Sequence, residues 1–318
     1  MPNKGVCLNL IKMYKTINNR MTEILQPETG CWVNVVAPNK EEINYILEML
    51  KVEPDFLNAA LDEEESSRSE KEDNQLLLLV DVPVAEKQED DSMLYYTMPI
   101  AIITTDDYII TMSLREQIIL NEIAAGAVKN VKTQMKTRFL LTILLRVAAR
   151  FLAYLKQIDK ITSQAERRLH KSMRNQELIQ LLDIEKSLVY FSTSLKSNEV
   201  TLEKILRGRI IKLYEEDEDL LEDVIVEVKQ AIEMCNIYSG ILKGTMDAFA
   251  SIISNNLNIV MKVLTCLTVI MTIPTMIYSF YGMNVTGLPL PHAWFPLALS
   301  LGATVFVTGI LYWKGMFR

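Results

Sequence analysis

Charge is absent from a long stretch near the end of this sequence. From Val263 through Trp313 there is no Lys, Arg, Asp or Glu. Two apolar runs, Val263–Phe280 and Ala293–Trp313, flank a short segment that contains two Gly and two Pro. Each run is close to the roughly 20 residues that cross the hydrocarbon core of a bilayer. We therefore predict an antiparallel pair of transmembrane helices; the alternative is a pair of helices buried in a large soluble core.

Residues that carry common catalytic and metal chemistry are scarce. The cysteines Cys7, Cys31, Cys235 and Cys266 have neither metal-ligand spacing nor a plausible pairing, a pattern typical of the reduced cytosol. There are two histidines, no Gly-rich phosphate loop and no Ser/His/Asp constellation. We predict that the protein is not an enzyme. A formal net charge of −7 argues against nucleic acid as a partner.

The N-terminal part alternates between strand and helix patterns. Helical spacing over 40–50 predicts a helix with Asn39 as its N-cap. The segment 66–69, between two acidic runs, is expected to be a turn. β-branched and aromatic residues predict strands at Trp32–Val36, Gln75–Val84, Leu94–Thr104 and Tyr108–Ser113.

Glycine and proline are missing from the middle of the chain. Neither occurs between Gly126 and Gly208, so we expect long helices over about 130–182 and 184–207. One further helix is expected from about Asp219 to Tyr281, and at 1.5 Å per residue it would measure roughly 95 Å. Such a helix is a stalk that continues into the first membrane span.

The predicted fold is an α+β cytosolic domain (an α/β sandwich plus long helices), followed by a stalk helix and a two-helix transmembrane hairpin. The first thirty residues lack the apolar core of a secretory signal. Lys and Arg flank the spans but are missing from 285–292, so the positive-inside rule predicts a multi-pass protein of the cell membrane with both termini cytosolic. The predicted parts are an α/β domain (1–125), a helical region (126–218), the stalk (219–258), the first span (259–281), an extracellular loop (282–292), the second span (293–313) and a basic tail (314–318).

One face of the stalk and first span carries small or polar residues at a period of 3.5. Asp247 and Asn258 favour the lining of a water-filled path, because polar groups near a span usually face water or partners. A small-residue packing seam is the alternative. Met261 and Leu264 can form an apolar constriction that gates by dewetting. Alternating steps of four and three residues define this polar stripe: Ser279, Thr275, Thr272, Thr268, Thr265, Met261, Asn258, Ser254, Ser251, Asp247, Gly244 and Gly240.

A single hairpin cannot enclose a pore, so the stripe predicts a ring of subunits that each contribute one helix. The same steps continue back from Gly240 through Ile237, Glu233, Gln230 and Val226 to Asp223. We therefore expect Asp223 to approach neighbouring subunits, where repeated carboxylates need a cation.

Motifs at both ends of the first span resemble the CorA family of magnesium transporters. Gly282-Met283-Asn284 follows an aromatic residue at the outer end, Asn258–Thr265 reads Asn-Ile-Val-Met-Lys-Val-Leu-Thr at the inner end, and Pro274 lies inside the span. The resemblance is close over roughly 221–318 and loose over the N-terminal half. It implies a homopentameric channel that passes Mg²⁺ down its electrochemical gradient. Gly282, Met283 and Asn284 would form the selectivity filter, with Asn284 binding the ion.

The resemblance also implies regulatory Mg²⁺ bound between subunits of the cytosolic part, and Asp223 matches its stalk carboxylate. The acidic pair of the family falls near Asn58-Ala59 here, so Asp62, Glu63 and Glu64 just downstream become the candidate partners. A second departure follows the signature, where relatives often carry Met-Pro-Glu-Leu and residues 288–291 are Leu-Pro-Leu-Pro. Without an acid in this loop, Asn284 is expected to carry most of the selectivity.

Two alternatives stay open. The same architecture handles zinc, cobalt or nickel, so Co²⁺ and Ni²⁺ are alternative substrates. Borderline metals prefer His and Cys ligands, and neither residue falls on the stripe, which favours Mg²⁺. The second alternative is a non-conducting, membrane-anchored helical scaffold, which would have no reason to keep a polar stripe through a span.

Overall fold

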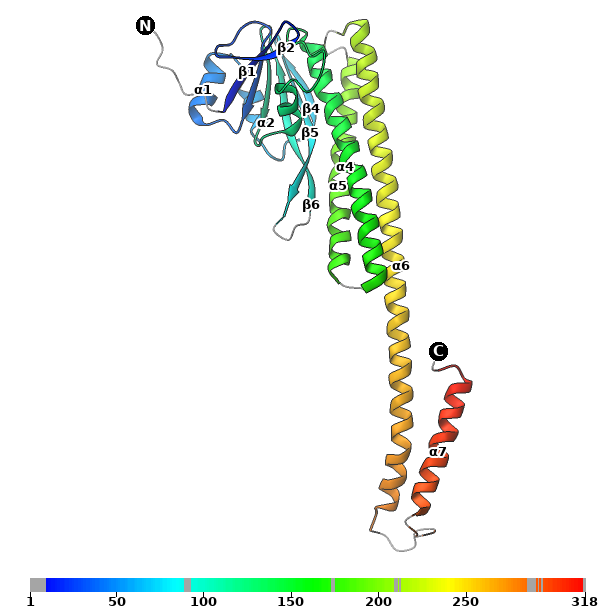
Figure 1. Cartoon of the computed structure of the whole chain (residues 1–318). Helices are drawn as coiled ribbons and strands as arrows, with labels where there is room; N and C mark the ends of the chain where they lie inside the picture. The colour runs from blue at the N-terminus through cyan, green and yellow to red at the C-terminus, as the bar shows by residue number, and fades with distance from the viewer. Residues whose placement is uncertain are drawn as a thin grey trace. The chain divides into compact units, whose positions relative to one another are not determined.

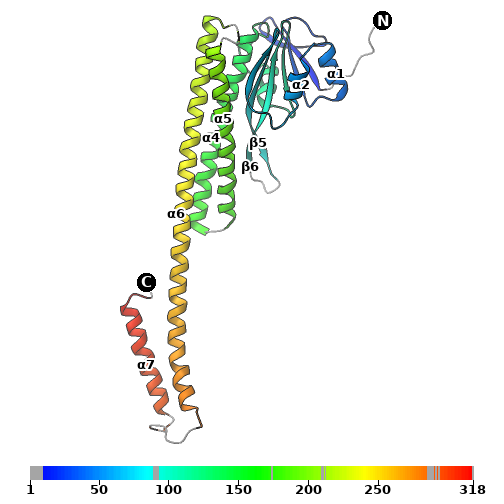
Figure 2. The same cartoon turned by 180° about the vertical axis from the view of Figure 1, so that it is seen from behind.

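The computed structural model describes residues 10–88, 93–172, 175–208, 211, 213–284, 290, 292 and 294–316. The chain divides into two compact units, Met1–Lys243 and Gly244–Arg318. Figures 1 and 2 show the elements of each unit from opposite sides.

The first unit contains one mixed sheet, in which seven strands are found among the described residues, in the order β2-β1-β3-β7-β6-β5-β4. β3 and β7 are parallel, and the other neighbouring strands are antiparallel. The strands are β1 (Ile11–Ile17), β2 (Arg20–Ile24), β3 (Trp32–Val36), β4 (Arg68–Glu72), β5 (Gln75–Lys87), β6 (Met93–Thr104) and β7 (Ile109–Ser113).

Helices cover both faces of this sheet. Helices α1 (Lys40–Glu48) and α2 (Pro54–Ala60) enclose a core in which Ile46, Phe56 and Leu77 are buried. The opposite face packs against α4 (Lys136–Ser172) and α5 (Asn175–Gly208), which stand beside the sheet in both views (Figures 1 and 2). Aromatic rings fill that contact, with Tyr95 of β6 near Tyr154 of α4 and Phe191 of α5.

The strand predictions are confirmed, with shifts of a few residues at their ends. Asn39 is the N-cap of α1, because its side chain accepts from the amides of Glu41 and Glu42, both at 2.9 Å. The turn expected over 66–69 is wrong in part: Arg68 and Ser69 begin β4, paired with β5. The residues of this edge strand are mostly charged and largely exposed. Its sequence therefore lacks the alternation of apolar and polar residues from which a strand can be predicted.

The predicted junction between the long helices is also wrong. We expected a break near residue 183, but α4 ends at Ser172 and α5 begins at Asn175. Leu181, Ile184 and Leu188 continue one buried face of α5 through the predicted break. Neither Gly nor Pro marks the real junction, so the 3.6-residue pattern alone could not locate it.

Helix α6 spans Glu215–Tyr281 and begins four residues earlier than predicted. In the first unit it buries Leu221, Val224, Val228 and Ala231 on one side. Cys235 is fully buried, its thiol donates to the Leu188 carbonyl at 3.1 Å, and burial raises its pKa to about 11. This cysteine therefore packs as an inert apolar residue.

The second unit pairs the remainder of α6 with α7 (Trp294–Trp313). Each of the two helices contains a segment that is long and apolar enough to span a bilayer. They run antiparallel (Figure 1). The rings of Tyr281 and Phe295 lie 6.1 Å apart near one end, and the Cys266 sulfur lies 4.0 Å from the Met316 carbonyl oxygen near the other. The predicted combination of an α/β domain, long helices and an apolar hairpin is confirmed.

Helix α3 (Ile118–Ala124) is held on α4 by a carboxylate between two arginines. Glu122 accepts hydrogen bonds from Arg150 and, at 3.0 Å, from Arg146. Burial alone would raise the pKa of Glu122, but the hydrogen bonds and charges of the two arginines lower it below its ordinary value of 4.5. A lowered folded-state pKa adds stability above the unfolded-state pKa, and this stability is lost as the pH falls through the folded value.

We expect Glu122→Gln to destabilise the protein by about 1 kcal/mol at pH 7, because the ion pairs are lost. Thermal unfolding of the solubilised protein, followed at pH 7 and near pH 4, measures this. The difference from the parent should shrink at the lower pH. An equal difference at both pH values would contradict the electrostatic account.

Candidate ion-conducting surface

The polar stripe lies on a face of α6 that the chain itself leaves uncovered. In the first unit, Asp223, Gln230 and Glu233 are exposed, while the buried positions of α6 lie on other sides of the helix. In the second unit, α7 covers a different strip of α6, on which Cys266 is buried and Ile270 and Ile273 are half-buried. Every position of the polar stripe from Gly240 to Ser279 is exposed.

Five of the stripe hydroxyls use their protons within the helix. Each of the five donates to the carbonyl oxygen four residues earlier, at 2.7–3.1 Å. A hydroxyl oxygen keeps acceptor lone pairs after donating its proton, so these groups present acceptors to whatever lies beyond the helix. The residues concerned are Ser251, Thr265, Thr268, Thr272 and Thr275.

The signature residues lie at the C-terminal end of α6. The Gly282 amide donates to the Tyr278 carbonyl at 2.9 Å, and the Met283 amide donates to the Phe280 carbonyl at 3.4 Å. A Cβ atom on Gly282 would lie 3.1 Å from the Tyr278 carbonyl oxygen, so a larger residue would crowd this helix end. Asn284 follows directly and is exposed. Residues 285–289 of the predicted loop lie outside the described residues.

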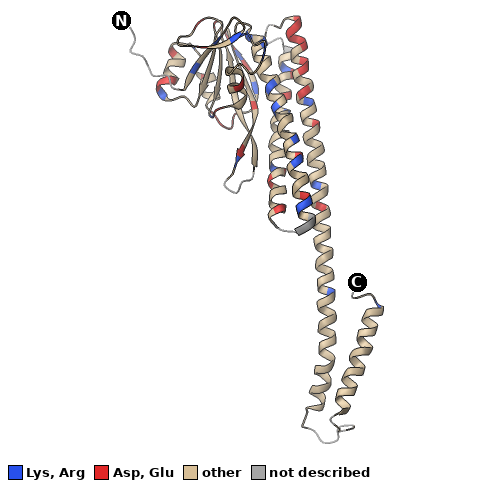
Figure 3. Ribbon diagram, in the orientation of Figure 1, with Lys and Arg blue, Asp and Glu red and all other residues tan. Residues whose placement is uncertain are grey.

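The electrostatics of this helix end favour a cation. The C-terminus of a helix carries about half a negative charge from its aligned peptide dipoles. The sequence places no carboxylate between Val263 and Trp313, and Figure 3 shows no red or blue residue along the described part of either span beyond Lys262. The helix dipole and the Asn284 amide oxygen therefore supply the negative potential here.

Further along α6, the other predicted lining residues are also exposed. Met261 lies on the stripe at 53% exposure, and Leu264, one turn away on the same side, is 54% exposed. Asn258 and Asp247 present an amide and a carboxylate at positions nearer the first unit. The order along the helix is thus a carboxylate, two serine hydroxyls, an amide, an apolar pair, five further hydroxyls that end at Ser279, and the Asn284 amide.

The predicted regulatory residues are not brought together within one chain. Asp62, Glu63 and Glu64 form an exposed turn after α2, where Asp62 accepts from the Glu64 amide at 2.9 Å. Asp223 is exposed on α6, where Asp and Glu gather along the first turns (Figure 3). Within the described part of a single chain, no group of three or more His, Cys, Asp or Glu could hold a metal ion.

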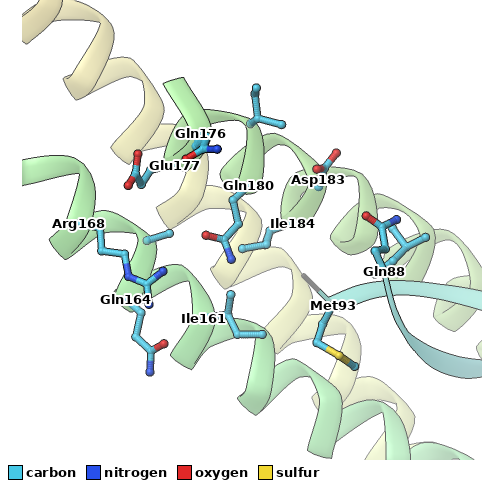
Figure 4. A pocket seen from close by; sticks show the side chains of 13 residues that line it. Gln88, Met93, Ile161, Gln164, Arg168, Gln176, Glu177, Gln180, Asp183 and Ile184 are labelled. Carbon is cyan, nitrogen blue, oxygen red and sulfur yellow. The ribbon is translucent and has the colours of Figure 1, made fainter. Parts of the chain in front are cut away.

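A cavity of about 660 Å³ with a mixed polar and apolar lining lies between α4, α5 and the ends of β5 and β6. Figure 4 shows Gln164 and Arg168 of α4 and Gln180 of α5 around it, with Met93 at the β6 end. Sequence reasoning gave no hint of this cavity. Its lining includes the carboxylates of Glu177 and Asp183, but these stand beside Arg168 and several glutamines, and the cavity lies in the first unit. The exposed face of α6, which continues through the apolar segment, is therefore the better candidate surface for ion passage.

The family model described as CorA-like Mg²⁺ transporter protein matches residues 27–314. The chain belongs to the CorA family. It is accordingly a CorA-type divalent cation transporter, a membrane protein with two apolar helices, and not an enzyme. The scaffold alternative is therefore set aside.

Two curated CorA relatives carry the name cobalt/magnesium transport protein. The protein from Methanocaldococcus jannaschii is 25% identical over 291 residues, covering 90% of this chain and 89% of its own length. The protein from Thermotoga maritima is 32% identical over 143 residues, covering 41% of each chain.

Solved structures share the CorA fold at lower identity. The complete structure of the CorA magnesium transporter from Methanocaldococcus jannaschii superposes with a TM-score of 0.80 at 21% identity, covering 96% of both chains. The full-length CmaX protein gives 0.71 at 16% identity, also covering 96% of both chains. The ZntB cytoplasmic domain from Vibrio parahaemolyticus gives 0.61 at 13% identity, covering 77% of this chain and 99% of that domain.

Proposed function

We propose that this CorA-type transporter is a Mg²⁺ channel, in which the polar stripes of several α6 helices line one water-filled path. The observation that carries the proposal is the uncovered polar face of α6. Hydroxyl and amide groups that face hydrocarbon lack partners for their free lone pairs and protons. Copies of α6 around a shared axis give these groups water and ions instead.

The chemistry of the stripe suits a hydrated ion. Mg²⁺ prefers six oxygen ligands at about 2.0–2.1 Å and loses its waters reluctantly. Water bound to a cation donates hydrogen bonds, and the stripe offers acceptors in its threonine oxygens and in the amide oxygens of Asn258 and Asn284. We propose that Gly282, Met283 and Asn284 form the outer selectivity filter and that Met261 and Leu264 form the constriction.

The direction of transport follows from the membrane potential. Two positive charges that move through about 100 mV release roughly 4.6 kcal/mol, so inward flow needs no nucleotide. We place the protein in the cell membrane as a homopentamer with both termini in the cytosol. Lys262 and Lys314 support this orientation, since positive residues favour the cytosolic side.

Cobalt is the second candidate, because both curated relatives are named for cobalt and magnesium. The ligand chemistry of the stripe supports magnesium. No His or Cys belongs to the stripe, and Cys266 is 0% exposed against α7 rather than free on the uncovered face. Zinc, cobalt and nickel gain most from nitrogen and sulfur ligands.

We further propose that cytosolic Mg²⁺ binds between subunits and holds the channel closed. Asp223 of one copy would meet Asp62, Glu63 and Glu64 of the next, which are exposed and therefore available to a neighbour. Carboxylates from two subunits repel one another unless a cation lies between them. Loss of Mg²⁺ would then separate the subunits at this point.

Asn284→Ala should reduce Mg²⁺ uptake at least about tenfold, because each subunit loses an amide acceptor for the hydrated ion. Growth rescue of a strain that lacks magnesium uptake provides the measurement. Thr308→Ala on α7 is the control, since this threonine also donates to the carbonyl four residues earlier, at 2.7 Å. Rescue by Asn284→Ala equal to that of the parent would remove Asn284 from the filter.

Asp223→Ala should raise the Mg²⁺ concentration that protects the protein from protease by about tenfold, because one partner of the proposed regulatory site is missing. Glu222→Ala is the matched control: it removes the same charge from the adjacent exposed position. If Mg²⁺ protects Asp223→Ala at the same concentration as the parent, Asp223 does not belong to the sensor.

A further inference from the structure

The side chain of Asn198 on α5 takes the place of a neighbouring strand at the edge of the sheet. The pairing of β4 with β5 stops at Arg68 and Leu79, whereas β5 continues to Lys87. At Asp81, the Asn198 oxygen accepts from the backbone amide at 2.9 Å, and its NH₂ group donates to the backbone carbonyl at 2.8 Å. A primary amide thus supplies the acceptor and the donor that a peptide group would supply.

This contact also includes the segment that leads into β4. The Ser67 hydroxyl donates to the Asn198 oxygen at 2.7 Å, and the Asp81 amide is within 3.3 Å of the same hydroxyl. Ser67 follows the acidic turn formed by Asp62, Glu63 and Glu64 at a distance of three to five residues. Asn198 is 3% exposed, so little water can compete for the hydrogen bonds of its side chain.

Helix α5 is in turn fixed to α6 directly beside this contact. Lys229 of α6 pairs with Glu199 at 3.8 Å and with Glu203 at 3.4 Å. Glu199 is the residue after Asn198, and Lys229 lies less than two turns from Asp223. A continuous set of contacts within the first unit therefore joins the acidic turn to α6.

We infer that Asn198 is a positioning residue for regulation by Mg²⁺: it holds the acidic turn and Asp223 of each subunit at a fixed relative position. This inference rests on the proposed function. An ion bound between the turn of one copy and Asp223 of the next restrains α6 only if the turn cannot move independently. Without the Asn198 contact, the turn shifts alone and ion binding no longer restrains the helix.

The test compares Mg²⁺-dependent protease protection in the full-length protein for Asn198→Ala and Asn198→Asp. The aspartate variant keeps the volume and the acceptor for the Asp81 amide, but places an oxygen opposite the Asp81 carbonyl. It therefore changes the hydrogen bond without opening a cavity. Both variants should need at least about fivefold more Mg²⁺ for half-protection.

Two controls separate positioning from general loss of stability. Tyr95→Phe removes a partly buried hydrogen bond between the sheet and α4, from the Tyr95 hydroxyl to Gln157 at 3.3 Å. Thr193→Ala removes an exposed hydroxyl of α5 that donates to its own helix at the Val189 carbonyl. Neither control should move the Mg²⁺ midpoint, whatever its effect on the thermal unfolding temperature.

The double variant with Asp223→Ala decides the mechanism. If Asn198 acts through the Asp223 site, adding Asn198→Ala to Asp223→Ala should shift the midpoint no further, because coupled residues are not additive. A full additive shift, or an unchanged midpoint in both Asn198 variants, would overturn the inference. If Asp223→Ala shifts the midpoint and Asn198→Ala does not, the proposed regulatory site stands and the inference about Asn198 fails. If Asn198→Ala shifts the midpoint and Asp223→Ala does not, both the proposed regulatory site and the inference fail.

Discussion

The structure depends on one constraint: a helix that crosses a membrane carries polar side chains along a face that its own chain does not cover. In hydrocarbon, each unpaired polar group costs free energy. The hydroxyls of α6 reduce this cost by donating to their own backbone, but their lone pairs, the Asn258 amide and the Asn284 amide still need partners. In the proposed function, water and a hydrated cation supply those partners, which would link the stripe to the transport of ions.

The rest of each chain leaves this face free. In the first unit, apolar residues such as Leu221 and Val228 turn other sides of α6 toward the chain interior. In the second unit, α7 packs on the strip that contains Cys266, Ile270 and Ile273. Within the first unit, the Asn198 contact joins the sheet to α5, and the ion pairs of Lys229 with Glu199 and Glu203 join α5 to α6. Under the proposed function, an ion bound on the first unit would therefore have a physical route to α6.

The elements with strong local patterns were predictable. The apolar spans, the 3.5-residue stripe, the buried strands and the Asn39 cap each depend on neighbouring residues in the sequence. The elements that were missed depend on partners far away. β4 is a strand because it pairs with β5, and its charged residues show no alternation. The junction at 172–175 has no Gly or Pro, and the Asn198 contact joins residues 117 positions apart, which no periodicity can reveal.

The most direct measurement is the reactivity of single cysteines with a charged, water-soluble thiol reagent in the membrane-embedded protein, in a background where all four native cysteines are serine. Thiol labelling requires water, because the thiolate is the reactive form. Cysteines at Thr268, Thr272 and Thr275 should react and be protected by Mg²⁺, whereas cysteines at Ile270 and Ile273 should not react. Unreactive stripe positions, or equal labelling at all five, would contradict a water-filled path lined by α6.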